Sequence, residues 1–239
     1  MKTSNPVPHA RNAGLTRTQL LCAIVVVSVI VALAMPVFRE ASRKGRITHS
    51  LCAAKQIGTA LKMYAGDNEG RFPPAQTDGA VPRGSGDYSN RALERLMPKY
   101  STSKRIFFNK ESAWCRNPAK DTAAADATLL KKGQNDWNYV TGLSEKSDAR
   151  WPLIATATAS ATDLTYSNVT SAKGGVFGGT DAVIGYTDGS ARVEACGNGS
   201  TNPADKTKTF PMRPDKTGES LFTATPEWLG TGRVILAPE

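Results

Sequence analysis

The feature that most constrains this chain is an uninterrupted apolar run over residues 20–38, LLCAIVVVSVIVALAMPVF, which contains no charged residue. At 1.5 Å of rise per residue, a helix of this length spans roughly 28 Å, close to the ~30 Å hydrocarbon core of a bilayer. So much apolar surface has to be covered by lipid or by other protein chains. The run therefore predicts a membrane anchor, a secretory signal or an assembly helix.

Positive charge is concentrated around this run. Residues 1–50 hold seven Lys and Arg against one acid, Glu40. Subtracting this net +6 from the +9 of the whole chain leaves +3 for residues 51–239. Because a nucleic-acid-binding face should lie on the globular part, the distribution favours contact between the flanks and anionic lipid over nucleic-acid binding.

The helical pattern continues beyond the apolar run. Apolar residues then recur at steps of three and four, which is the spacing of one helical face. They are Ile47, Leu51, Ala54, Ile57, Leu61 and Tyr64. We predict one near-continuous helix over residues 16–65, with a kink at Pro36 and an end at the Gly-rich residues 66–70.

Strand patterns follow the helix. The clearest is a hairpin, in which residues 182–187 and 190–195 flank Asp188-Gly189, a two-residue turn signal. Residues 136–141 and 151–157 form a second candidate pair. Weaker predictions are a strand at 105–108, a strand at 233–236, a helix at 91–97 capped by Asn90, and a mostly irregular tail over 196–239.

One long helix followed by strands predicts an α+β fold, with the helix packed on a small antiparallel sheet. The predicted segments are a leader (1–14), the transmembrane half of the helix (15–38), its amphipathic half (39–66) and a loop-rich β domain (67–239). The length of this last domain is sufficient for a core of its own.

The sequence does not predict an enzyme. The chain has only two histidines, His9 and His49, so the distal domain lacks Ser-His-Asp and Cys-His catalysis and histidine metal sites. Loop acids explain the pair Asp121 and Asp126 more simply than acid–base catalysis does. No cofactor or metal site is predicted, although a structural calcium ion held by Asp67 and the two residues after it, or by acids of the tail, stays open.

The four cysteines, Cys22, Cys52, Cys115 and Cys196, match no zinc or redox spacing. Cys22 lies in the apolar run and Cys52 shortly after it. Only Cys115 and Cys196 belong to the distal domain. If that domain lies outside the cytoplasm, these two are a candidate disulfide.

Two general interpretations of the amino terminus stay open. In the first, Ala32-Leu33-Ala34 is a signal-peptidase site and the secreted protein begins near Met35. The apolar run is long for a signal, however, and the helical pattern continues through that cut. In the second, the run is a plain signal-anchor. The four cations that follow it outnumber the three before it, and this count by itself places the distal domain in the cytoplasm.

A third interpretation comes from resemblance. Residues 14–19, GLTRTQ, followed by the uncharged helix, resemble the cleavage and methylation motif of type IV pilins and type II secretion pseudopilins. The resemblance implies processing by prepilin peptidase between Gly14 and Leu15 and N-methylation of Leu15. It also implies assembly roles for Thr16, for Gln19 and for Pro36, which falls at the position of a helix-kinking proline in pilins.

The resemblance covers residues 1–75 well and residues 135–195 loosely. In a large pseudopilin-like family a histidine precedes an Asp-Gly hairpin by ten positions, and here Gly178 stands in its place before Asp188. Arg17 and Thr18 replace apolar motif residues. Gln19 replaces a glutamate that in pilins pairs with the amino terminus of a neighbouring subunit. This exchange fits a minor or tip-located subunit, and it also fits a degenerate paralogue.

The resemblance therefore implies a structural subunit, major or minor, of a pseudopilus or pilus-like filament. Its partners would be other pilin or pseudopilin subunits, prepilin peptidase and the inner membrane, with the carboxyl-terminal domain periplasmic or extracellular. No small-molecule substrate is expected, and nucleic acid is not favoured as a partner. The alternative is a membrane-anchored or secreted binding module for an anionic polymer or DNA.

Overall fold

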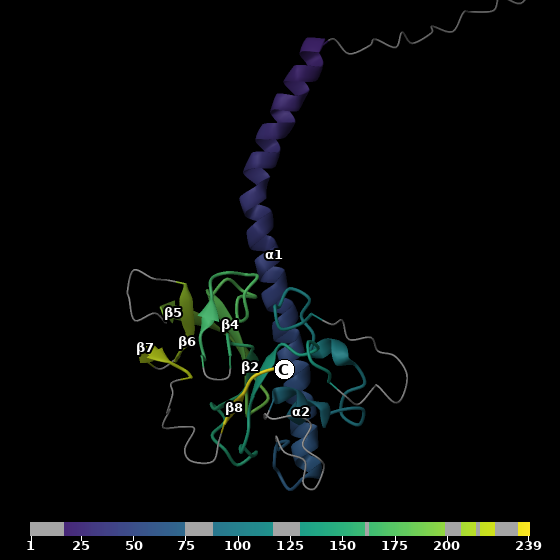
Figure 1. Ribbon diagram of the computed structural model, residues 1–239, viewed down its shortest axis with the longest axis vertical. Helices are drawn as coiled ribbons and strands as arrows, with labels where there is room; N and C mark the ends of the chain where they lie inside the picture. Colours follow the sequence, from purple (N-terminus) through teal and green to yellow (C-terminus); the bar gives the residue numbers. More distant parts are fainter. Residues whose placement is uncertain are drawn as a thin grey trace, which may run out of the picture. The chain divides into compact units, whose positions relative to one another are not determined.

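The computed structural model describes residues 17–74, 88–116, 130–160, 163–198, 207–213, 216–222 and 234–239. The chain divides into two compact units, Met1–Lys44 and Gly45–Glu239. Helix α1, Arg17–Asp67, contributes its first 28 residues to the first unit and the remainder to the second (Figure 1).

Helix α1 confirms the predicted long helix and includes Pro36 within it. It ends two residues later than expected. The backbone N–H groups of Asn68 and Gly70 both donate to the carbonyl of Ala65, at 3.0 and 2.8 Å. Glu69 and Gly70 have φ values of 57° and 77°, so the chain reverses through two left-handed residues. This is the usual way in which a helix end satisfies its last carbonyls.

The second unit contains an antiparallel sheet of eight strands with the order β3-β6-β5-β4-β2-β1-β8, and β7 pairs with β6 outside this path. The strands are β1 Trp137–Val140, β2 Pro152–Thr156, β3 Tyr166–Ser167, β4 Asp181–Tyr186, β5 Ala191–Asn198, β6 Lys208–Arg213, β7 Lys216–Ser220 and β8 Ile235–Leu236. Two short helical elements, α2 Ser89–Glu94 and η1 Lys104–Ile106, precede β1. The fold is therefore α+β, as predicted.

Both predicted strand pairs are present. Strands β1 and β2 are antiparallel, and β4 and β5 form the hairpin. The turn is longer than the expected two residues, because the Gly189 N–H donates to the Tyr186 carbonyl and the Tyr186 N–H donates to the Ser190 carbonyl. Gly189 has φ 83° and closes a three-residue loop, so Asp188-Gly189 occupies its last two positions.

Two local predictions are wrong. Residues 105–108 are not a strand, since η1 is a 3-10 turn in which the Ser103 hydroxyl accepts a hydrogen bond from the Arg105 N–H. The short helix is Ser89–Glu94, and its N-cap is Tyr88. Asn90 lies inside this helix, where its amide donates to the backbone carbonyls of residues 130 and 131. Asn90 therefore makes tertiary hydrogen bonds and does not cap the helix as predicted.

The tail contains more strand than predicted. Strand β5 continues to Asn198, and β6 and β7 follow within the region that was expected to be irregular. Of the strand predicted at 233–236, the structure has β8 at Ile235–Leu236. Strand β6 includes Pro211 and charged ends, so its own sequence has little strand pattern, and pairing with β5 supplies its conformation.

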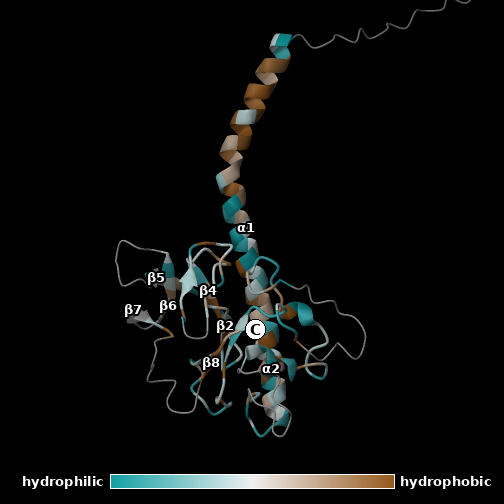
Figure 2. Cartoon of the chain, in the orientation of Figure 1, coloured by the Kyte–Doolittle hydropathy of each residue, from teal (hydrophilic) through white to brown (hydrophobic). Residues whose placement is uncertain are grey.

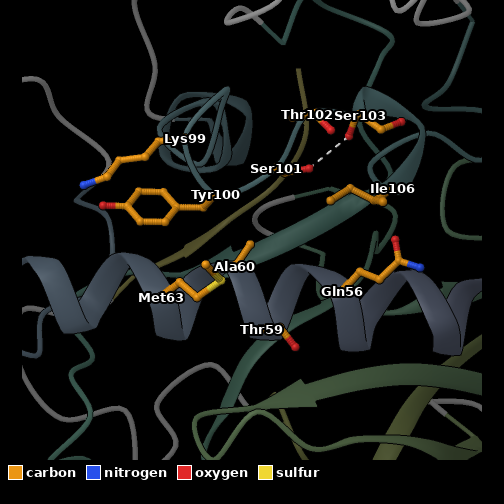
Figure 3. Close-up of a pocket in the computed structure, with 10 residues that line it drawn as sticks. All are labelled: Gln56, Thr59, Ala60, Met63, Lys99, Tyr100, Ser101, Thr102, Ser103 and Ile106. Carbon is orange, nitrogen blue, oxygen red and sulfur yellow. Dashed lines mark hydrogen bonds between the residues drawn. The ribbon is translucent and has the colours of Figure 1, made fainter.

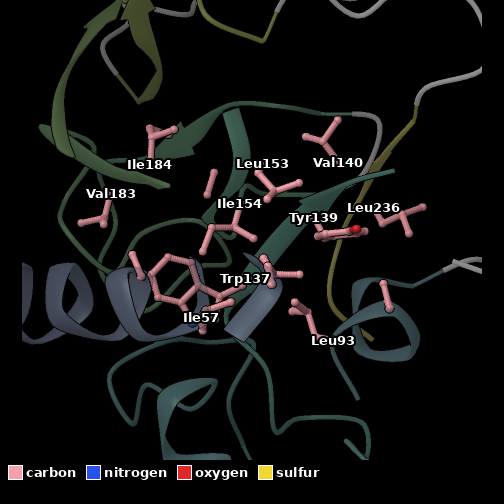
Figure 4. Close-up of a cluster of buried hydrophobic side chains, with 14 of the residues drawn as sticks. Ile57, Leu93, Trp137, Tyr139, Val140, Leu153, Ile154, Val183, Ile184 and Leu236 are labelled. Carbon is pink, nitrogen blue, oxygen red and sulfur yellow. The ribbon is translucent and has the colours of Figure 1, made fainter. Parts of the chain in front are cut away.

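The core forms where the second part of α1 packs on the sheet (Figure 4). Ile57 and Leu61 of α1 are fully buried. They belong to one cluster with strand residues that include Tyr139, Leu153, Ile154, Val183 and Ile184. Burial of each large aliphatic side chain contributes about 1.5–3 kcal/mol. This packing fixes the amphipathic half of the helix to the β domain.

Candidate functional site

The first candidate functional feature is the apolar surface of α1. Thirteen large hydrophobic side chains within residues 20–38 are each at least half exposed. They are Leu20, Leu21, Ile24, Val25, Val26, Val27, Val29, Ile30, Val31, Leu33, Met35, Val37 and Phe38. Figure 2 shows this apolar run along the helix. Among the described residues, α1 is the one helix long and apolar enough to cross a membrane.

The polar groups within this run are few. The Ser28 hydroxyl donates to the Ile24 carbonyl at 2.8 Å, so it is satisfied within the helix. Pro36 has no N–H, and the carbonyl of Ala32 therefore lacks its usual helical donor. Gln19 lies in the first turn of the described helix. Such a segment can sit in hydrocarbon because nearly all its polar groups are paired internally.

A cationic flank follows the apolar run. Arg43 holds Glu40 with two hydrogen bonds, Nη2 to Oε1 at 2.7 Å and Nε to Oε2 at 3.0 Å. Lys44 Nζ lies 3.9 Å from Glu40 Oε1. The hydrogen bonds from Arg43 lower the pKa of Glu40, so this carboxyl group, the only acid of the flank, is ionised. The positive charge of Arg43 balances its negative charge. Arg39 is exposed at the end of the run.

The sequence-predicted site residues have different outcomes. Gly14, Leu15 and Thr16 lie outside the described residues, so cleavage and methylation stay predictions. Gln19 and Pro36 both lie in α1, as expected. Cys115 and Cys196 are free thiols in the structure.

The two distal thiols have separate surroundings. Cys115 is buried in the loop after η1, and its sulfur accepts a hydrogen bond from the Asn109 N–H at 3.3 Å. Cys196 is half-buried on β5. Burial raises the pKa of both thiols, for Cys196 to about 12. Neither is therefore activated as a nucleophile, and the disulfide between them stays a prediction.

The residues suggested for calcium are engaged in other contacts. The Asp67 carboxylate accepts hydrogen bonds from Lys99 Nζ at 2.6 Å and from the Tyr100 hydroxyl at 2.9 Å. Glu69 Oε2 lies 3.7 Å from Arg71. Within the part of the chain that the structure describes, no group of three or more His, Cys, Asp or Glu side chains is placed to hold a metal ion.

Sequence reasoning missed a buried carboxyl group, Asp136, which lies immediately before β1. Its side chain accepts a hydrogen bond from the Ser112 hydroxyl. Its backbone N–H donates to the Phe107 carbonyl, and its carbonyl accepts from Ala157, both at 2.9 Å. Burial raises the pKa of Asp136 to about 7. The group links the loop after η1 to strands β1 and β2, and no sequence pattern marks its carboxyl group as buried.

Sequence reasoning also missed a groove beside α1, shown in Figure 3 and called the α1 groove below. Its volume is about 430 Å³. It lies between one face of α1 and the segment that precedes and includes η1. The lining residues are Gln56, Thr59, Ala60 and Met63 of the helix and Lys99, Tyr100, Ser101, Thr102, Ser103 and Ile106. The groove is formed by residues that are distant in sequence, so no local motif predicts it.

Comparison with protein-family models, with curated proteins and with solved structures finds no match to this chain.

Proposed function

We propose that this chain is a structural subunit of a type II secretion pseudopilus or type IV pilus-like filament. Prepilin peptidase cleaves it between Gly14 and Leu15, and Leu15 is then N-methylated. The chain is held in the inner membrane by residues 20–38 until assembly, with its β domain periplasmic or extracellular. Its role is mechanical, and its partners are other subunits of the same class.

The observation that supports this proposal most directly is the contrast along α1. Residues 20–38 expose their large apolar side chains, whereas Ile57 and Leu61 of the same helix are buried on the sheet. A signal peptide would not need a continuation that is built into the core of the mature domain. One part of this helix can lie in a hydrophobic environment while the other part stays packed in a folded domain. Such a helix is suited to pass from lipid into the core of a filament.

The composition of the exposed run suits packing between helices. Ala23, Ser28, Ala32 and Ala34 are small, and small residues let helix backbones approach closely where no hydrophobic effect drives association. Gln19 can exchange hydrogen bonds with a neighbouring amino terminus but cannot neutralise its charge. We therefore expect weaker self-assembly than with a carboxylate at this position, which fits a minor or tip-located subunit.

Mass spectrometry of the mature amino terminus, from cells that also produce prepilin peptidase, tests the proposal. The expected species begins with methylated Leu15. A chain that begins near Met35 would mean ordinary secretion, and an intact Met1 would mean a plain anchor, and either result contradicts the proposal. Gly14→Arg should block processing. Gly45→Ala is the matched control, because a Cβ at that position has no heavy atom within 4 Å.

One observation favours the second candidate, a binding module for an anionic polymer or DNA. Lys173 Nζ lies 3.6 Å from the centroid of the Trp114 ring. Desolvation, and then the nearby Lys132 and Arg116, lower the pKa of Lys173, so two further cations lie near this lysine. Salt-sensitive DNA binding by the full chain, weakened in Lys173→Gln, would support this candidate.

A further inference from the structure

The α1 groove has a defined shape because its aromatic wall is held at two points. The Tyr100 hydroxyl donates to Asp67 at 2.9 Å. The Tyr100 ring also packs edge-to-face on Tyr64, with centroids 5.6 Å apart and planes at 67°. Ala60, Met63 and Ile106 complete the apolar part of the lining. A side chain fixed in this way loses little freedom when a ligand binds.

The polar groups of the groove retain hydrogen-bonding capacity. Gln56 and Thr102 are exposed, and their side chains have no hydrogen-bond partner among the residues that the structure describes. The Thr59 hydroxyl donates to the Lys55 carbonyl at 2.9 Å, and that of Ser101 donates to the Ser103 carbonyl at 3.2 Å. Both oxygens can still accept. The groove therefore suits a ligand that donates hydrogen bonds as well as accepting them.

The charge of the groove excludes strongly charged ligands. Among the described residues that line it, the one cation is Lys99, which lies 2.6 Å from the Asp67 carboxylate, and this pair is electrically balanced. A fully ionised phosphate or carboxylate ligand offers only acceptors and would find no unpaired cation among the lining residues that the structure describes. A neutral ligand with many hydroxyl groups meets the acceptors of Thr59 and Ser101 and can place its C–H faces on Tyr100 and Met63.

We propose that the α1 groove is a binding site for a neutral saccharide of about one or two rings, a size that matches small-ligand sites of roughly 300–1,000 Å³. An extended peptide is less suited, because peptides usually bind by adding backbone hydrogen bonds to a sheet edge or by placing an apolar helix face in an apolar groove. The α1 groove instead offers side-chain hydroxyl and amide groups. This site belongs to the β-domain unit and does not depend on filament assembly.

Saturation-transfer NMR on the full chain in lipid nanodiscs tests this inference, with cellobiose, maltose and diacetylchitobiose as probes. We expect saturable binding of at least one disaccharide. Thr102→Val and Gln56→Leu should each weaken it about 2- to 10-fold, since one hydrogen bond is worth about 0.5–1.5 kcal/mol. Thr170→Val is the matched control, because Thr170 is exposed and does not line the groove.

Three results would overturn the inference. They are the absence of binding for all three disaccharides, equal affinity in the groove variants and the control, and binding of a Gly/Ser-rich peptide in place of the sugars. Thr102 and Gln56 are exposed, so their substitution should leave the thermal unfolding temperature unchanged and loss of binding will not reflect misfolding. The mature amino terminus is measured separately, so failure of the filament proposal is distinguishable from failure of this one.

Discussion

At the scale of single residues, Asp136 is the group whose burial has the clearest thermodynamic consequence. In the unfolded chain a carboxyl of this type titrates near 3.8, whereas burial raises the folded pKa to about 7. The folded state therefore holds a proton that the unfolded state releases between these values. The stability that this proton gives is complete below about pH 4 and is lost as the pH rises through 7.

The first prediction is that unfolding free energy falls with rising pH and that Asp136→Asn removes most of this fall. With a pKa of 3.8 in the unfolded chain and about 7 in the folded chain, the unfolding free energy should fall by about 3 kcal/mol between pH 5 and pH 8. The asparagine variant keeps the shape and cannot ionise, so it should be more stable than the parent at pH 8. Urea unfolding of the detergent-solubilised chain at pH 5 and pH 8 measures the effect.

Asp163→Asn provides the control for that series. The hydrogen bond from Lys208 lowers the pKa of Asp163, so its contribution is lost only as the pH falls below the ordinary carboxyl range. Its substitution should leave the difference between pH 5 and pH 8 unchanged. A parent chain with equal stability at both pH values would contradict the prediction for Asp136.

The second prediction concerns the thiols. Cys52 is exposed on α1, whereas Cys115 is buried and bonded to the Asn109 N–H. Because the thiolate is the reactive form and burial raises the pKa of Cys115, iodoacetamide should modify Cys52 at least about a hundredfold faster. After unfolding without reductant, a count of four thiols would exclude the candidate disulfide. A count of two, with Cys115 and Cys196 protected, would instead establish the candidate disulfide.

At the scale of elements, α1 contacts the turn of the β4–β5 hairpin. Lys62 Nζ donates to the Asp188 carbonyl at 3.3 Å, and its side chain lies over Gly189. A Cβ added at Gly58 would lie 3.5 Å from the Gly189 carbonyl oxygen, which is an ordinary contact distance. The helix and the turn therefore approach closely, and a small residue at position 58 permits this approach.

The third prediction compares two substitutions at this contact. Gly58→Ala fits the available space and improves helix propensity, so it should leave unfolding free energy unchanged or raise it by up to about 1 kcal/mol. Gly58→Leu must displace the hairpin and should cost about 1–3 kcal/mol. Urea unfolding of both variants at one pH measures the difference. Equal stability of the two would mean that the hairpin does not pack against position 58.

Much of this arrangement could be predicted from sequence because its signals are local. The stripe that includes Ile57 and Leu61 predicted the buried helix face, and Asp188-Gly189 predicted the hairpin. Strands β6 and β7 could not be predicted, since pairing with neighbours gives them their conformation. The α1 groove could not be predicted from sequence either. Tertiary packing brings Gln56 and Thr102 together, and they are too far apart in the sequence for any local motif to include both.

At the scale of the whole molecule, exposed apolar residues and net positive charge are both concentrated near the amino-terminal end of the sequence. Residues 20–38 contain twelve Leu, Ile, Val and Phe residues, and four cations follow within the next eight positions. On insertion scales each such apolar residue favours the membrane by about 0.3–0.6 kcal/mol, for a sum of about 4–7 kcal/mol. This free energy is large enough for stable anchoring in the membrane. Two charged residues near the centre of the run would cost about as much and would cancel it.

The last prediction uses this balance. Val26 and Ile30 are four residues apart near the centre of the run, and each Arg placed there should cost about 2.5–3.5 kcal/mol. The double variant Val26→Arg/Ile30→Arg should therefore move from the carbonate-resistant membrane fraction to the soluble fraction or be degraded. Val26→Leu/Ile30→Leu, which preserves the apolar character, should remain with the membrane. If the double Arg variant stayed as resistant to carbonate as the Leu control, residues 20–38 would not be the anchor, and retention would have to come from the β domain or from a partner.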